Sequence, residues 1–359
     1  MKNSIGNDSG NPFKMLEAAH YDLCVREFDD GAPVVFDSSF SKQGSLWSIH
    51  QFVATVLKSN DAAFKVERKG AHVRLEPSSK LKLHRYFNVI KTSFGLVPEG
   101  TRFYGFVGLF FESCDELEIE YGLLLSPMQN YSDKKIAAEI FNDLLEKIRE
   151  LAKSSKYKKT VKDLKCRTSR NFRSMKSYAD ALFDQYSKLL VLRIDFGYHR
   201  VQGVPIRVKR ILNDFTRLLN NRRNNGLFEH IVGYIRRLEY GNDKSWHLHV
   251  MFFFNGQETQ SDRVLARLIG NYWKTVITDN DGTAFNCNAS KNEYKFCGIG
   301  KIDHADTERR THLLYALTYL TKKDEVLGFD VPTDVKMITR GEMPKPPVNR
   351  LGRKRKDSA

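Results

Sequence analysis

The sequence lacks the features that mark membrane-spanning, secreted, zinc-ribbon and repeat proteins. No apolar run is long enough to span a bilayer, and the polar N-terminus lacks the apolar core of a signal peptide. The five cysteines are odd in number and contain no Cys-x-x-Cys pair, which argues against a zinc ribbon or a disulfide scaffold. The absence of internal repeats argues against a solenoid or propeller. These absences together favour a cytoplasmic protein that does not bind membranes.

Positive charge is in excess. The chain has 58 Lys and Arg against 43 Asp and Glu, which gives a net charge of +15 at pH 7. Such a balance favours a polyanionic partner, and a membrane surface is the weaker reading of it. A length of 359 residues, with 41% hydrophobic and 12% aromatic residues, is enough to bury the cores of about two globular domains.

The first half of the chain predicts an accessory domain of mixed α/β type and unknown role at residues 46–155. It follows a partly irregular N-terminus at 1–45, and residues 156–185 are expected to be a basic connector and helix. Nine Lys and Arg crowd residues 153–173, which indicates a linker, a phosphate-facing surface or simply a solvated basic face. Expected elements of the accessory domain are helices near 47–58 and at 133–153, and strands at 103–111 and 117–125.

The second half shows a more regular alternation of elements. Gly241 to Lys244 supply turn residues between two extended runs, which predicts a hairpin. A proline-containing basic tail at 329–359 is expected to be flexible. The expected strands are 189–196, 228–240 and 246–254, the expected helices are 208–220, 261–277 and 307–323, and residues 283–303 are expected to be irregular to extended.

A His-x-His triplet in the hairpin predicts a metal site. In a strand, residues two apart share a face, so His247 and His249 project together while Leu248 and Val250 point to the other side. Glu239 lies eight residues earlier, and the turn can bring its carboxylate beside the two imidazoles. Two histidines and one carboxylate can hold a divalent metal, with manganese or magnesium expected. The alternative is that both imidazoles face solvent and Glu239 is an ordinary surface charge.

The last expected helix carries a second group of candidate residues. Tyr315 and Tyr319 are spaced i and i+4, and Lys322 follows three residues later, so all three lie on roughly one side of a helix. Tyrosines at this spacing are usually packing residues. In a basic protein with a metal site, however, a tyrosine hydroxyl can attack a phosphodiester and form a covalent phosphotyrosine. Lys322 can stabilise the developing charge or lower the pKa of the phenol.

These three motifs, in this order, resemble those of HUH endonucleases. Residues 190–195 look like the first motif, His247-Leu-His249 like the second, and Tyr315-x-x-x-Tyr319-x-x-Lys322 like the third. More closely, residues 186–325 resemble the inovirus gene-II-type replication initiators, also called the YagK/YfjJ C-terminal domain family. The resemblance implies a nicking domain at 186–328, with an antiparallel sheet and flanking helices of the RNA-recognition-like palm type. The expected fold class is therefore α+β.

The resemblance also implies an enzyme. Family members nick one strand of origin DNA site-specifically, stay joined to the 5′ phosphate, and leave a 3′ end that primes rolling-circle replication of a phage, prophage or related element. His247, His249 and Glu239 then become metal ligands and Tyr319 the nucleophile. The partners implied are single-stranded or supercoiled origin DNA and a host replication helicase. A transposase, a plasmid relaxase and a noncatalytic DNA-binding prophage regulator stay open as alternatives.

Two residues keep more than one interpretation. In initiators of small isometric phages that carry paired tyrosines, a lysine follows each tyrosine at the third place, whereas here Thr318 holds that place after Tyr315. A second nucleophilic role for Tyr315 is therefore open. Asp195, at the end of an apolar strand, can contact metal or DNA, but a cap or salt-bridge partner is the commoner role for such a residue.

Overall fold

The structure is a computed structural model that describes most of the chain in two compact units. It describes residues 48–70, 72–88, 103–119, 126–132, 134–199, 207–241, 245–327 and 335–345, and for residues 240–241, 319 and 322–327 it describes the backbone only. The N-terminal unit lies within Phe36–Thr168, and the second unit, here called the sheet unit, is built on Ser169–Lys322.

The N-terminal unit combines helices with a small hairpin, which agrees with the expected mixed α/β character. Aromatic rings fill its core, where Phe52 stacks on Phe141 with the ring centroids 5.5 Å apart. Its elements are a helix at 48–56, β1 (Phe64–Lys69), β2 (His72–Pro77), α4 (Gly105–Glu116), α5 (Ala137–Lys153) and the first part of α6 (Ser155–Gln185). The helices predicted near 47–58 and at 133–153 are confirmed.

The strand predicted at 103–111 is wrong, because this segment contributes most of its residues to α4. Val107, Phe110 and Cys114 are buried at spacings of three and four residues, which is the period of a helix. Aromatic and β-branched residues gave the run a strand-like composition, but its packing against α5 determined the helical form. The strand predicted at 117–125 lies mostly outside the described residues, as does the prediction for residues 1–45.

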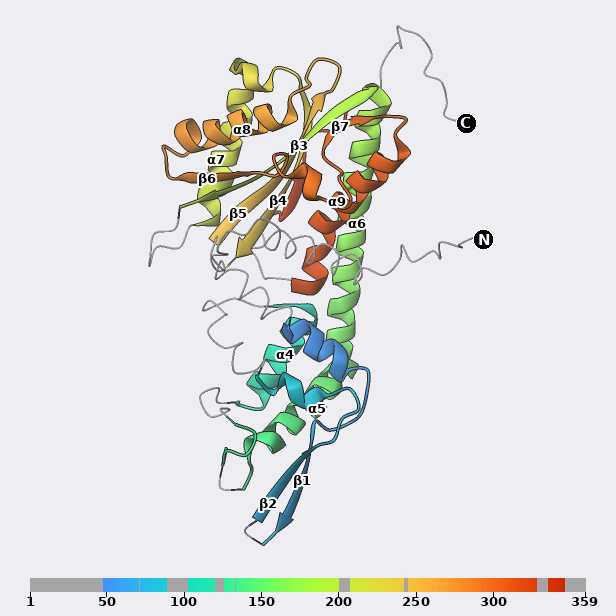
Figure 1. The fold of residues 1–359 in the computed structure, drawn as a ribbon, viewed down its shortest axis with the longest axis vertical. Coiled ribbons are helices and arrows are strands. Elements are labelled where there is room, and N and C mark those ends of the chain that lie inside the picture. Colours follow the sequence, from blue (N-terminus) through green and yellow to red (C-terminus); the bar gives the residue numbers. More distant parts are fainter. Residues whose placement is uncertain are drawn as a thin grey trace, which may run out of the picture. The chain divides into compact units, whose positions relative to one another are not determined.

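The sheet unit is an antiparallel sheet flanked by helices, so the α+β fold class is confirmed (Figure 1). The strand order is β6-β3-β5-β4-β8, and β7 pairs with the other half of β3. Its strands are β3 (Lys188–Tyr198), β4 (Ile231–Gly241), β5 (Ser245–Asn255), β6 (Gly282–Asn286), β7 (Gly300–Asp303) and β8 (Ile338–Arg340). Its helices are the end of α6, α7 (Val208–Asn221), α8 (Asp262–Tyr272, followed by a π-helical turn at Trp273–Ile277) and α9 (Thr307–Leu327).

Strand alternation divides the sheet between two hydrophobic cores. Even-numbered residues such as Leu192 on β3 and Val250 on β5 pack against α7 and α8. Odd-numbered residues such as Val191 and Met251 pack on the opposite face, against α6 and α9. Because both faces are covered, β5 is buried almost throughout its length. The odd-numbered face is the one that carries the candidate site.

The ends of the sheet unit differ in part from the sequence-based expectation. The crowded basic stretch is helical, since it runs from the last residue of α5 into α6, and its Lys and Arg side chains are exposed. A flexible tail at 329–359 is wrong for Ile338–Arg340, which form β8 and pair with Ile235 to Arg237 of β4. Residues 329–334 and 346–359 of the predicted tail lie outside the described part of the chain. None of the helices in the described ranges combines the length and the apolar character needed to cross a membrane.

Candidate metal centre

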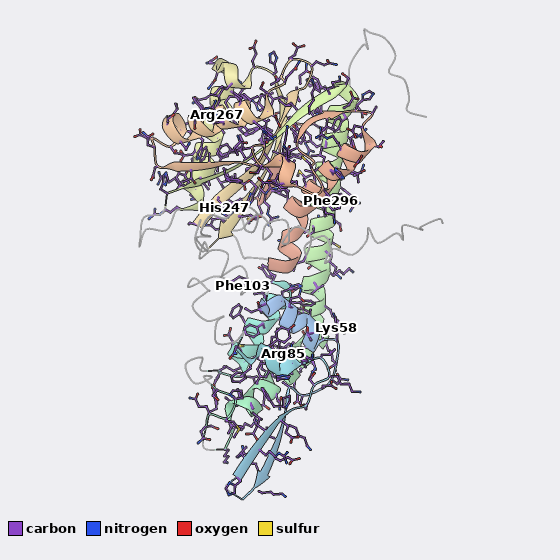
Figure 2. The ribbon with its side chains drawn as sticks, viewed as in Figure 1. Lys58, Arg85, Phe103, His247, Arg267 and Phe296 are labelled. Carbon is purple, nitrogen blue, oxygen red and sulfur yellow. The ribbon has the colours of Figure 1, made fainter. Side chains whose placement is uncertain are left out.

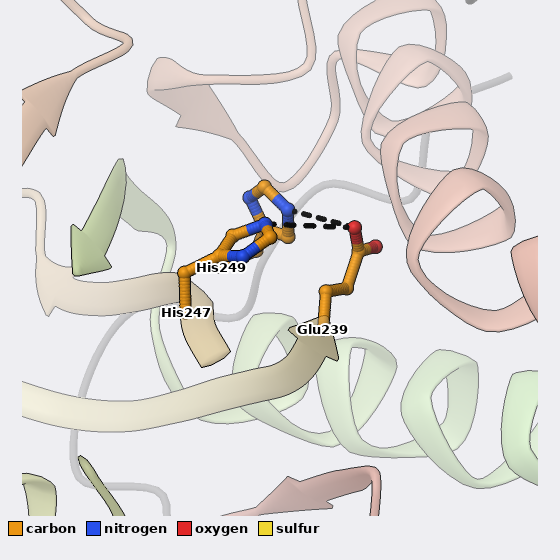
Figure 3. A group of neighbouring side chains, drawn as sticks. All are labelled: Glu239, His247 and His249. Carbon is orange, nitrogen blue, oxygen red and sulfur yellow. Dashed lines mark ion pairs between the residues drawn. The ribbon is translucent and has the colours of Figure 1, made fainter. Parts of the chain in front are cut away.

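The three predicted ligands meet on the face of the sheet that α9 covers. In the register of the β4–β5 hairpin, Glu239 lies opposite His247, and His249 lies two residues along β5 on the same face. Both imidazoles turn toward the Glu239 carboxylate (Figure 3). The predicted hairpin, and the shared face of the two histidines, are thereby confirmed. The alternative in which both imidazoles face solvent is wrong, because all three side chains are buried.

The geometry of this cluster fits a small cation. One ligand atom from each residue lies within 4.8 Å of the others. Glu239 Oε2 is 3.8 Å from His247 Nε2 and 3.2 Å from His249 Nε2, and the relative exposure of the three residues is between 4% and 8%. Burying a carboxylate is costly unless a cation or hydrogen-bond donors compensate it. A carboxylate oxygen that faces two imidazole nitrogens therefore supplies a suitable donor set for a divalent ion.

An oxygen atom lies beside the Nδ1 atom of each histidine. His247 Nδ1 lies 3.0 Å from the backbone carbonyl oxygen of Ser245, which can only accept. His249 Nδ1 lies 2.7 Å from Asp195 Oδ1, in an ion-pair contact. When Nδ1 carries the proton, Nε2 is the nitrogen that can bind a metal ion, and in both histidines Nε2 faces Glu239. Histidines that bind metals in proteins are commonly oriented by such outer contacts, so this arrangement supports ligation through Nε2.

A buried arginine joins the cluster to α9. Arg237 is 3% exposed; its Nε donates to Glu239 Oε1 at 2.8 Å, and its Nη1 donates to the backbone carbonyl of Leu320. Leu320 is the residue after Tyr319, so this contact holds the middle of α9 beside the carboxylate. The bond from Arg237 Nε to Oε1 orients Glu239 and leaves its second oxygen, Oε2, facing the histidines.

The charges of the cluster balance without a metal ion. Asp195 and Glu239 are negative, and Arg193 and Arg237 are positive, with Arg193 Nε 3.5 Å from Asp195 Oδ1. Burial would lower the pKa of His249, but the negative charges of Asp195 and Glu239 outweigh it and raise that pKa above its usual value. Burial opposes ionisation of Asp195, yet the positive charges of His249 and Arg193 hold its pKa well below the usual range. Although the cluster is neutral as a whole, the two carboxylates favour positive charge at His249, either as a bound proton or as a metal ion.

We expect metal binding to strengthen as the pH rises. Below the raised pKa of His249, a metal ion must displace a proton, so its apparent affinity should fall by about tenfold for each pH unit. Above that pKa the affinity should level off. Calorimetric titration of the protein with Mn²⁺ at several pH values between 5 and 8.5 measures this dependence. Asp195→Asn removes a negative charge that raises the pKa of His249, so the Mn²⁺ affinity of this variant should level off at a lower pH than that of the wild type. A wild-type affinity that does not depend on pH would contradict ligation by His249.

The remaining predicted residues lie on α9, whose leucines pack on the same face of the sheet as the cluster. Leu313, Leu317 and Leu320 are buried there. Tyr319 and Lys322 belong to the helix, but their side chains lie outside the described part. The Tyr315 side chain is half-buried and packs its ring edge to face against Phe296, with the centroids 5.4 Å apart. The structure thus assembles Glu239, His247 and His249, and places the backbone of the tyrosine motif beside them.

Two further residues belong to the site. Asp195 takes the salt-bridge role that was expected as the commoner one, with ion pairs to His249 and Arg193, whereas Arg237 was not predicted. Asp195 contacts His249 from the neighbouring strand β3, where the register pairs the two residues directly. Its spacing from Val191 places Asp195 on the odd-numbered face of the strand. Its contact with His249 follows only from the pairing of β3 with β5. Arg237, two residues before Glu239, gave no signal beyond its position on the same face.

Comparisons with known proteins give one match. No curated protein and no solved structure matches the chain. A family model matches a region that begins at residue 151, earlier than residue 186, where the sequence resemblance started. The match therefore includes all of α6 as well as the candidate metal centre and α9. Residues 151–327, just under half of the chain, match the model of the YagK/YfjJ C-terminal domain, a family of prophage-type proteins.

Proposed function

We propose that this protein is a metal-dependent endonuclease of the HUH type, which nicks and rejoins one DNA strand to start rolling-circle replication of a phage, prophage or related element. The observation that carries the proposal is the buried cluster of Glu239, His247 and His249, held against the helix that bears the tyrosine motif. Two imidazoles and one carboxylate that are all buried and converge within 4.8 Å of one another form a donor set that suits a divalent ion.

The charge of the cluster suits a phosphate ligand. With neutral histidines, the two carboxylates balance the two arginines. A divalent ion held by Glu239, His247 and His249 would make the cluster positive, polarise the scissile phosphate and stabilise the negative charge that grows on it. Asp195 and Arg237 would hold the ligands in position, since one contacts His249 and the other Glu239.

The chemical step belongs to Tyr319. Its phenolic oxygen loses a proton and attacks the phosphorus, a new phosphorus–oxygen bond forms, and the bond to the 3′ oxygen breaks. The 3′ oxygen takes up a proton and leaves as a hydroxyl, while the 5′ phosphate stays joined to the tyrosine. Attack by a 3′ hydroxyl on the phosphotyrosine reverses the step and reseals the strand. Lys322 would stabilise the charge that develops on the phosphate.

Covalent capture of DNA tests this function. The full-length protein is incubated with 5′- or 3′-end-labelled single-stranded DNA and with supercoiled DNA from the element that encodes it, in Mn²⁺ or Mg²⁺ and separately in EDTA. We expect nicking and a protein–DNA adduct that survives denaturing electrophoresis, with label retained only from the 3′ portion of the cut strand. A protein that binds this DNA but never forms an adduct would be a noncatalytic regulator.

The transposase and relaxase alternatives use the same step and differ in their DNA. Neither is favoured by any contact in the described residues. A replication initiator should nick a phage origin, a relaxase a transfer origin, and a transposase a terminal hairpin. A nicking assay with these three DNAs therefore separates the three functions.

A further inference from the structure

Three aromatic rings form a partly exposed cluster where the segment before β7 crosses α9. The ring centroid of Phe296 lies 5.4 Å from that of His312 and 5.4 Å from that of Tyr315, and the last two are 6.1 Å apart. Phe296 remains 41% exposed, beside α9 (Figure 2). A ring that is supported by other rings and open to solvent can stack on a flat partner.

The segment that carries Phe296 is anchored on both sides of it. Tyr294 and Cys297 pack against the core that lies between the sheet and α9, and Ile299 is buried. Gly298 crosses α9 so closely that a Cβ at this position would lie 2.5 Å from the carbonyl carbon of His312. Since only glycine allows this approach, the chain is pressed onto the helix, and the exposure of Phe296 is a property of a well-packed segment.

Positive charge lies next to the exposed ring. Lys295 is itself exposed, and its Nζ lies 5.5 Å from the centroid of Phe296. Proteins that bind single strands combine aromatic rings, on which bases stack, with cations that track the backbone. A duplex hides the faces of its bases, so a ring of this kind can stack only on bases that are unpaired.

The cluster is close to the proposed nucleophile along α9. Tyr315 precedes Tyr319 by one helical turn, a rise of about 6 Å at 1.5 Å per residue. This distance is comparable to the spacing of successive nucleotides in an extended strand.

We propose that Phe296, His312 and Tyr315 form a stacking platform for unpaired bases of the DNA strand that is cut, and that Lys295 binds a neighbouring phosphate. The inference rests on the proposed nicking function and identifies the substrate at this position as single-stranded. It gives Tyr315 a role in binding DNA, as a positioning residue, rather than as a second nucleophile.

Binding measured without catalysis tests the platform. Fluorescence anisotropy with a labelled 15-nucleotide single strand, and with the matched duplex, is recorded in EDTA for the full-length protein. We expect Phe296→Ala to weaken single-strand binding by about 5- to 150-fold, the range that corresponds to the loss of one stacked base. Binding of the duplex should change by less than about twofold. Phe296→Trp, which keeps a flat ring, should retain the wild-type affinity.

Matched variants separate stacking from a general loss of apolar surface. Leu268 is 39% exposed and lies on α8, the helix that covers the other face of the sheet, so Leu268→Ala should leave single-strand binding unchanged. Tyr315→Phe keeps the ring and should retain both binding and strand joining, whereas Tyr315→Ala should lose binding. Equal affinities of wild type and Phe296→Ala for the single strand would overturn the platform, as would equal losses for single strand and duplex.

The outcomes for the platform and for nicking are distinguishable. If Phe296→Ala loses single-strand binding in EDTA while the wild type forms no adduct in Mn²⁺, the platform stands and the nicking function fails. If the wild type forms the adduct but Phe296→Ala binds normally, the nicking function stands and the platform fails. Loss of strand joining in Tyr315→Phe, with first cleavage intact, would overturn the binding role of Tyr315 and make it the second nucleophile.

Discussion

Replacing Tyr319 by phenylalanine should abolish the covalent protein–DNA adduct while leaving DNA binding intact. The substitution removes only the hydroxyl that attacks the phosphorus, so the rate of adduct formation should fall to background, a loss of about 10⁴-fold or more. Binding of single-stranded DNA in EDTA should change by less than about twofold. Both quantities are measured with one labelled oligonucleotide, by denaturing electrophoresis and by anisotropy.

Tyr315→Phe is the matched control for this variant, because it makes the same chemical change one turn earlier on α9. It should form the first adduct at the wild-type rate. Adduct formation by Tyr319→Phe together with its loss in Tyr315→Phe would move the nucleophile to Tyr315. Equal activity of both single variants would contradict a unique role for Tyr319.

Replacing Glu239 by glutamine should weaken metal binding without weakening DNA binding. The amide keeps the shape of the side chain and an oxygen that can accept from Arg237, but it loses the negative charge that faces the two histidines. We expect the Mn²⁺ concentration for half-maximal adduct formation to rise by about 10- to 100-fold. Alanine is less suitable here, because it would leave buried Arg237 without its carboxylate and destabilise the fold.

Glu258→Gln is the control for the loss of one negative charge, since Glu258 is exposed beyond the end of β5. It should leave the Mn²⁺ dependence unchanged. The affinity of Glu239→Gln for single-stranded DNA in EDTA should equal that of the wild type. Equal losses of metal activation and of DNA binding in Glu239→Gln would argue that the cluster stabilises the fold instead of holding a metal ion.

Much of this site could be predicted because a hairpin is a local structure. The period of two along a strand places His247 and His249 on one face, and a short turn limits which residues of the preceding strand can lie opposite them. Glu239 therefore followed from the sequence. The helix of the tyrosine motif followed from the spacing of Leu313, Leu317 and Leu320.

The parts that the sequence left open or did not reveal depend on contacts between distant segments. Asp195 is far from His249 along the chain, and only the pairing of β3 with β5 makes them neighbours. Arg237 needed both its strand and α9 in place before its two partners were visible. The helical form of α4 had the same origin, since an apolar and aromatic run fits either period until its packing partners are known.

The most direct test of the central claim is to identify the residue that becomes joined to DNA. Wild-type protein is incubated with single-stranded origin DNA and Mn²⁺, digested with protease and nuclease, and analysed by mass spectrometry for a peptide that carries a nucleotide. We expect one modified peptide, in which a nucleotide is joined through its 5′ phosphate to Tyr319. A modification on another residue, or cleaved DNA with no covalently modified peptide, would contradict the central claim.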